Sequence, residues 1–134
     1  MSSHPDVFLG SAVWIQVDGG HPAFILSDPA EANGTALFIR FTSYRPDRHA
    51  SFEVFTPEDF AELRNDSVVA YYGAKAPDAV VVQGAINDGS FKLISPLPPP
   101  VLLRIVQEAK EHDDFSPAFL KFLPPEDHPS CDGG

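Results

Sequence analysis

The chain has 134 residues, of which 43% are hydrophobic and 21% are charged, and its formal net charge is −10. This composition is typical of one soluble globular domain and excludes a disordered or collagen-like chain. No apolar run approaches the roughly 20 residues of a membrane span and no signal-peptide pattern is present, so we expect no membrane partner and a cytoplasmic location. Cys131 is the only cysteine, which excludes an intrachain disulfide and a thiolate metal centre.

Acidity is the strongest feature of the composition. Nineteen Asp and Glu face nine Lys and Arg, so the far field of the protein repels nucleic acid. A nucleic-acid function therefore requires a local basic patch, and the chain has one basic stretch, which starts at Arg40. Arg45, Arg48 and His49 in this stretch are the candidate phosphate-binding residues. For the two arginines, pairing with Asp47 or with other surface acids is an equally weighted alternative.

The first half of the chain predicts strands and turns. Alternating β-branched and aromatic residues predict four strands, over 11–17, 22–27, 35–42 and 51–55. Asp18-Gly19-Gly20 predicts a turn between the first two strands, because Asp and Gly accept positive φ. Thr56 predicts the start of a short helix, since Thr is a good N-cap and Asp59 completes a near capping box.

The second half predicts more strands and then a helix. Apolar runs predict strands over 67–72, 79–86 and around 91–94, with a hairpin signal at Asn87-Asp88-Gly89-Ser90 between the last two. Apolar residues recur with helical spacing over 101–110, and a further helical turn is expected within 116–122. From Pro124 onwards the chain is rich in Pro, Asp and Gly.

These elements predict a mainly β fold with a C-terminal helix. Several short strands at close spacing and one late amphipathic helix indicate a small antiparallel barrel or a strongly bent sheet. We expect one domain over residues 1–123 and a disordered tail over 124–134.

The order of four short motifs resembles a known family. They are Val13-Trp14-Ile15-Gln16-Val17, Pro22-Ala23-Phe24-Ile25-Leu26-Ser27, Thr42-Ser43 and Phe52-Glu53-Val54. In this order and spacing they resemble the PemK/MazF toxins of bacterial toxin–antitoxin modules. The resemblance covers most of residues 10–110.

The resemblance implies a barrel of the Src-homology-three type, a homodimer, and a cognate antitoxin protein as a further partner. It also implies growth inhibition through cleavage of single-stranded RNA without a metal or other cofactor, in which the ribose 2′-hydroxyl attacks the adjacent phosphate. His21 takes the place of the family's catalytic Arg before the Pro of the second strand. Thr42 and Ser43 keep the hydroxyl position, and Arg64 with Asp66 corresponds to an Arg-x-Asp pair of some members.

Each candidate also has a structural interpretation. His21 has a proton-transfer role or hydrogen-bonds its turn, with equal weight. Thr42, Ser43 and Asp66 are residues that commonly cap strands and turns. The functional alternative to an endoribonuclease is a catalytically degenerate barrel of the same fold that acts as a protein-binding or regulatory module. Convergence of His21, Thr42 and an arginine in one groove separates the two functions.

Overall fold

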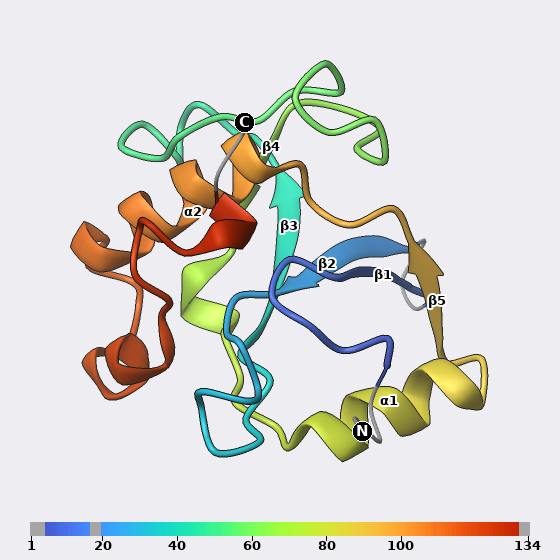
Figure 1. Cartoon of the computed structure of the whole chain (residues 1–134). Helices are drawn as coiled ribbons and strands as arrows, with labels where there is room; N and C mark the ends of the chain where they lie inside the picture. The colour runs from blue at the N-terminus through green and yellow to red at the C-terminus, as the bar shows by residue number, and fades with distance from the viewer. Residues whose placement is uncertain (1–4, 17–19, 132–134) are drawn as a thin grey trace.

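The computed structural model describes residues 5–16 and 20–131 and contains one five-stranded antiparallel sheet (Figure 1). The strands are β1 (Ala12–Ile15), β2 (His21–Ile25), β3 (Phe38–Ser43), β4 (Ser67–Val69) and β5 (Phe91–Ile94). Their order across the sheet is β4-β3-β2-β1-β5. The small β-rich fold with a late helix is as predicted from the sequence. Among the described strands β4 and β5 do not pair, so the sheet does not close into a barrel.

Two helices pack on different faces of the sheet (Figure 1). Helix α2 (Pro99–Glu111) buries Val101, Leu102, Ile105, Val106 and Ala109 in the main core, which also holds Phe24 and Phe41. This confirms the predicted helix over 101–110. Helix α1 (Ala79–Asn87) covers a second, smaller core beside Ile25. Within the described ranges, neither helix combines the length and the hydropathy that crossing a bilayer requires.

The segment 79–86 is a helix, and the predicted strand there is wrong. Val80, Val81 and Val82 favour a strand by propensity, but tertiary context decides the outcome. Asp78 caps the helix, since its carboxylate accepts the backbone N–H of Val80 at 3.2 Å. The predicted hairpin at 87–90 is the end of this helix and the turn into β5.

The segment 51–55 does not form the predicted strand. It has one bridge to the sheet, between Phe55 and Ser67. Its alternating pattern instead places Phe52 against the ring of His112, with a centroid distance of 4.3 Å, and buries Phe55 fully. The residues after it form two turns, at 57–59 and 61–62, rather than a helix. Thr56 and Asp59 still make the expected cap, because Asp59 Oδ2 accepts the N–H of Thr56 at 2.8 Å.

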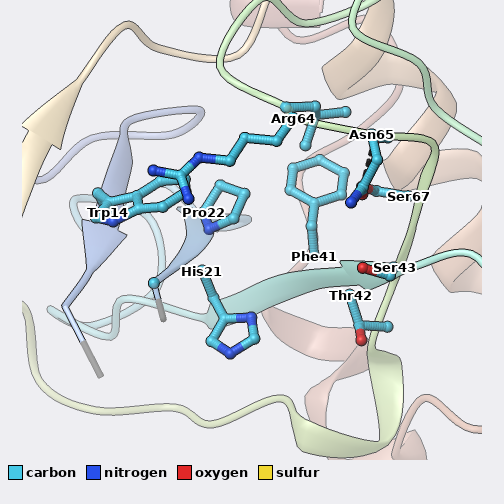
Figure 2. Close-up of a pocket in the computed structure, with 11 residues that line it drawn as sticks. Trp14, His21, Pro22, Phe41, Thr42, Ser43, Arg64, Asn65 and Ser67 are labelled. Carbon is cyan, nitrogen blue, oxygen red and sulfur yellow. Dashed lines mark hydrogen bonds between the residues drawn. The ribbon is translucent and has the colours of Figure 1, made fainter. Parts of the chain in front are cut away.

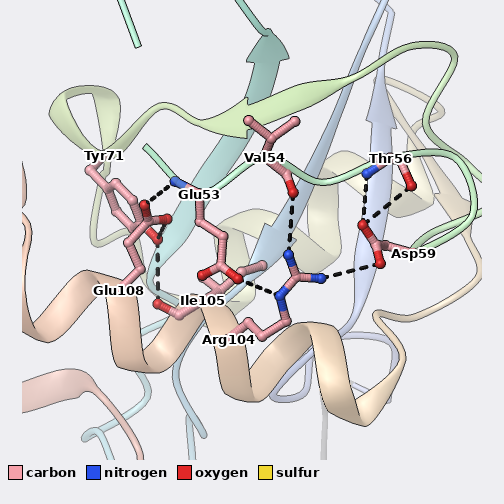
Figure 3. Close-up of polar contacts among 8 residues, drawn as sticks. All are labelled: Glu53, Val54, Thr56, Asp59, Tyr71, Arg104, Ile105 and Glu108. Carbon is pink, nitrogen blue, oxygen red and sulfur yellow. Dashed lines mark hydrogen bonds and ion pairs between the residues drawn. The ribbon is translucent and has the colours of Figure 1, made fainter. Parts of the chain in front are cut away.

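A polar network ties α2 to this segment (Figure 3). Arg104 forms ion pairs with Glu53 and Asp59 and donates to the carbonyl of Val54. One turn further along α2, Glu108 accepts the N–H of Glu53 at 2.6 Å. An irregular segment is thereby fixed against a helix without strand pairing.

Residues 124–131, for which the sequence predicted disorder, pack against the rest of the chain. A short 3₁₀-helix over Pro129–Cys131 contacts α2, and Cys131 is buried in the main core. The His128 ring is near Asp28, with 3.5 Å from Nε2 to Oδ2. Local composition misses this packing because the contacts are made with residues far away in the chain. The predicted turn residues Asp18 and Gly19 and the end of the tail, 132–134, lie outside the described residues.

Candidate functional site

A shallow hollow of about 110 Å³ opens where β2 begins and β3 ends (Figure 2). Four of the five predicted catalytic residues line it: His21, Thr42, Ser43 and Arg64. Trp14, Pro22 and Phe41 supply most of its apolar wall. These residues come from three strands and the loop before β4, so only the folded chain assembles them.

His21 and Thr42 lie on the neighbouring strands β2 and β3, and both line the hollow. The pairing of β2 with β3 ends at Ala23 and Arg40, so both residues lie just beyond the paired part of the two strands. Figure 2 shows both side chains pointing to one side of β3, away from Phe41. One phosphate can therefore meet an imidazole and a hydroxyl together.

Arg64 reaches the hollow from the opposite side of β3 (Figure 2). Its guanidinium carbon lies 4.4 Å from the ring centroid of Trp14, which is a cation–π contact. This contact holds the arginine on the face of Trp14 and Phe41. The three groups of the predicted convergence therefore share one hollow, but Arg64 does not share the face of His21 and Thr42.

Ser43 lies on the same side as Arg64. It pairs with Ser67 across β3 and β4, and the Ser67 hydroxyl donates to the carbonyl of Asn65 at 2.9 Å. Asp66 does not line the hollow. Its side chain is exposed and its carbonyl accepts the N–H of Tyr44 at 2.9 Å, which favours the turn-forming interpretation of this residue.

The predicted RNA-binding residues occupy a separate loop after β3. Arg45 and Arg48 are exposed, and neither forms an ion pair with any acid in the described ranges. His49 has a structural role, because its Nδ1 accepts the N–H of Arg45 at 2.9 Å and its ring packs on Phe52 at 4.9 Å. The two arginines remain available to an anion, outside the hollow.

Arg40 is a cation on the face of His21 and Thr42, and the predicted catalytic set does not contain it. It is half-buried and lies two residues before Thr42 on β3, about 7 Å along the strand. The alternation of buried Ile39 and Phe41 with Arg40 and Thr42 is visible in the sequence and is the signal for this placement. An arginine side chain spans such a distance, so Arg40 can reach an anion held at His21.

Gly20 is the second residue that the sequence analysis did not assign to the site. Its φ is +90°, and a Cβ there would come 2.5 Å from Cε2 of Trp14. The indole therefore packs directly on the glycine backbone, which fixes the wall that Arg64 covers. Only glycine satisfies both the conformation and the contact.

Asp28, Glu31 and His128 bring three potential ligand atoms within 4.8 Å of one another, and none of the three residues lines the hollow. His128 Nδ1 accepts the N–H of Ser130 at 3.1 Å, so the neutral ring carries its proton on Nε2. Nε2 faces the two carboxylates as a donor and has no lone pair for a cation. The arrangement suits an anchor for the tail rather than a metal centre.

Comparison with models of known families, with curated proteins and with solved structures finds no match for this chain.

Proposed function

We propose that the protein is a metal-independent endoribonuclease of the PemK/MazF type that acts on single-stranded RNA and inhibits growth. The observation that carries the proposal is that His21 and Thr42 both line one hollow and point to the same side of β3. The antiparallel sheet with a late helix is compatible with a barrel of the Src-homology-three type, in which a further contact closes the sheet. The motif order of the sequence supports the same family.

The reaction is an internal transesterification. His21 removes the proton of a ribose 2′-hydroxyl, and the resulting oxygen attacks the adjacent phosphorus. The bond from phosphorus to the 5′-oxygen breaks, leaving a 2′,3′-cyclic phosphate, and the 5′-oxygen takes a proton from the imidazolium or from water. Thr42 donates a hydrogen bond to a phosphate oxygen, and Arg40 supplies the positive charge that the pentacovalent state requires.

Arg64 and Ser43 have a different role in this scheme. They lie on the other side of β3, where the indole of Trp14 holds the guanidinium. From there Arg64 attracts the next phosphate along the strand, and Arg45 and Arg48 extend the positive path beyond the hollow. Asp66 takes no part, since its side chain faces solvent away from the hollow.

A second candidate is a catalytically degenerate barrel that acts as a protein-binding or regulatory module. The separation of Arg64 from His21 across β3 favours it, because an active ribonuclease gathers its cation and its base around one phosphate. The net charge of −10 also opposes RNA. Arg40 supports the ribonuclease, since it is a described cation on the face of His21 and Thr42.

A homodimer and an antitoxin partner belong to the proposal through the resemblance alone. The apolar face of α2 is buried in the chain's own core and supplies no dimer interface. Light scattering at tens of micromolar tests the dimer, and a monomer mass there removes the homodimer from the proposal.

The test of the activity uses a fluorescently labelled single-stranded RNA and the full chain, with and without an excess of EDTA, over a range of pH. Wild-type protein should cleave, with a rate that falls away from neutrality. His21→Gln should lower the rate about a hundredfold or more, the usual scale for losing a general acid or base. Thr42→Val and Arg40→Gln should each lower it, whereas Ser51→Ala, at an exposed loop position, should not.

Absence of cleavage by the wild type at every pH contradicts catalysis and leaves the binding module. Cleavage that EDTA abolishes contradicts the metal-independent chemistry. RNA affinity is measured separately with Arg45→Ala/Arg48→Ala. The double variant should bind more weakly and with a flatter salt dependence, because two phosphate contacts are lost. Unchanged binding would place the RNA path away from this loop.

A further inference from the structure

A second cleft lies between the sheet and α1, and none of its lining residues lines the hollow of His21 and Thr42. Its apolar end, about 400 Å³, lies between Phe38 and Phe91 of the sheet and Val81, Val82 and Ala85 of α1. Its other end, about 300 Å³, is lined by Ile15, Arg40 and Gly73. Phe38 and Lys75 line both ends. The two ends of the cleft therefore adjoin: the apolar end lies under α1, and the cationic end lies beyond the helix.

Strand geometry places the two cations together. Phe38 and Arg40 are two residues apart on β3 and so share a face. Lys75 joins that face because it forms a bridge with Phe38, in which each backbone N–H donates to the other's carbonyl, at 2.7 and 2.9 Å. Arg40 and Lys75 thus come from different segments to the same end of the cleft.

Neither cation has an acidic partner. In the described ranges no ion pair includes Arg40 or Lys75. By contrast, Arg104 pairs with two carboxylates, those of Glu53 and Asp59. The chain has nineteen acidic residues for nine Lys and Arg. Two adjacent unpaired cations in so acidic a protein form a local site for a negative group, which charge-assisted hydrogen bonds would hold.

The group that binds at the apolar end must be apolar, unlike the negative group that binds at the cationic end. Phe38 and Phe91 stack there, with ring centroids 5.2 Å apart and planes 5° from parallel. Val81, 61% exposed, presents an aliphatic side chain at the rim. Lys75 is the one residue with a polar side chain among those that line this end. A sugar or a nucleobase would leave its polar groups unsatisfied against these walls, whereas a hydrocarbon would not.

We propose that this cleft binds a small amphipathic monoanion, an aliphatic or aromatic carboxylate. Its apolar body lies between α1 and the Phe38–Phe91 pair, and its carboxylate meets Arg40 and Lys75. The apolar end is within the size range of small-molecule sites. The site goes beyond the proposed ribonuclease, since it needs neither His21 nor Thr42, and it shares only Arg40 with that activity.

The test is isothermal titration calorimetry of the full chain with three probes of equal chain length: octanoate, octanol and octyltrimethylammonium. Octanoate should bind saturably at one site per chain. Octanol should bind more weakly, about tenfold, because it lacks the charge-assisted hydrogen bonds. Octyltrimethylammonium should not bind, since the cationic end of the cleft repels it.

Two variants act on the two ends independently. Lys75→Gln should weaken octanoate about tenfold and leave octanol unchanged. Ala85→Phe should weaken both probes, because its ring fills the apolar end. Lys92→Gln, which removes an exposed lysine of β5 outside the cleft, is the charge control. Thermal unfolding of each variant shows whether it is folded.

Equal affinity for octanoate and octanol, or absence of saturable octanoate binding, overturns the proposal. Equal loss in Lys75→Gln and Lys92→Gln also overturns it, since the effect is then one of net charge. A concentration-dependent doubling of mass that Ala85→Phe abolishes would assign the cleft to a second copy of the chain instead. His21→Gln should leave octanoate affinity unchanged, so failure of the ribonuclease proposal and failure of this one are separately visible.

Discussion

The phenol of Tyr71 donates a hydrogen bond of 2.8 Å to Oε1 of Glu108, 37 residues further along the chain (Figure 3). Tyr71 is almost fully buried, at 1% exposure. The other carboxylate oxygen of Glu108 accepts the N–H of Glu53. Burial, and then the charge of Glu108, raise the pKa of Tyr71 far above its ordinary value of 10.0. One carboxylate thus joins the loop after β4, helix α2 and the segment before Thr56.

Tyr71→Phe should lower the free energy of unfolding by about 1 kcal/mol at neutral pH, the usual net value of one hydrogen bond. Because the folded-state pKa is raised, the stability of the neutral phenol is fully present below about pH 10 and is lost as pH rises further. Wild-type stability should therefore fall more steeply than that of Tyr71→Phe above about pH 10. Urea unfolding at several alkaline pH values measures both effects, and parallel curves would contradict the buried phenol.

Asp59 should affect stability at low pH, as Tyr71 does at high pH. The N–H of Thr56, and after it the guanidinium of Arg104, lower the pKa of Asp59 below its ordinary 3.8. A lowered folded-state pKa means stability that is present above the unfolded value and is lost as pH falls through the folded one. Asp59→Asn should cost about 1 kcal/mol at neutral pH, since the group is partly exposed, and less near about pH 2.5. Glu58→Gln, one residue away and exposed, should show no such pH-dependent difference in urea unfolding.

Gly20→Ala tests the packing of the hollow's wall. Gly20 and Gly89 have nearly the same φ, +90° and +87°, but a Cβ at Gly89 meets no heavy atom within 4 Å. Gly89→Ala is the control. Both substitutions strain the backbone by about 1 kcal/mol, but only Gly20→Ala also displaces the indole of Trp14. Gly20→Ala should be the less stable variant and should shift the fluorescence of Trp14, the only tryptophan. Equal stability and an unshifted spectrum would mean that the indole does not rest on Gly20.

The Cys131 thiol reports on the packing of residues 124–131. It is 3% exposed, and desolvation raises its pKa, so it should react slowly with a disulfide reagent in the native protein. His128→Ala removes the contact with Asp28 and should increase the reaction rate about fivefold, because the segment opens more often. Asp127→Asn, at an exposed position of the same segment, should leave the rate unchanged. A fast native reaction would show that this segment is not packed.

The sequence predicts correctly a strand in which buried and less buried side chains alternate along the chain. In β3, buried Ile39 and Phe41 alternate with Arg40 and Thr42 as the pattern indicates. Helix α2 follows from its regular apolar spacing. The strand predicted over 51–55 fails because alternation states which side chains are buried, not what the backbone pairs with. Phe52 and Phe55 do turn inward, but onto a histidine ring and an aromatic core.

The sequence also carries a helical pattern over 79–87, but the strand propensity of its valine run is the stronger local signal. Ala79, Val82 and Gln83 are buried and Ile86 is half-buried, which is the spacing of one helical face. The valine run outweighs this spacing in a local analysis. Two hydrogen bonds from a distant segment fix the backbone at Asp78. The carbonyl of Gly34 accepts the N–H of Ala79 from 45 residues away, and the N–H of Ala36 donates to the carbonyl of Pro77 from 41 residues away.

The candidate site was predictable in its membership but not in its geometry. His21, Thr42, Ser43 and Arg64 were all expected, and one hollow contains all four. Which side of β3 each one takes depends on the register with β2 and on the contact of Arg64 with Trp14. Neither is encoded locally. Lys75 was not singled out, because its partner Phe38 lies 37 residues earlier.

Residues 79–82 make the unfolded chain prone to aggregation. Before Asp78 and the second core are in place, Ala79-Val80-Val81-Val82 prefers an extended backbone and has no charge to interrupt it. β5 is at the edge of the sheet and pairs on one side only, with β1. A misfolded chain can therefore add its valine run to the open edge of β5 in a folded neighbour. Aggregation on heating should begin with this pairing, and Val81→Lys at the exposed position should delay it.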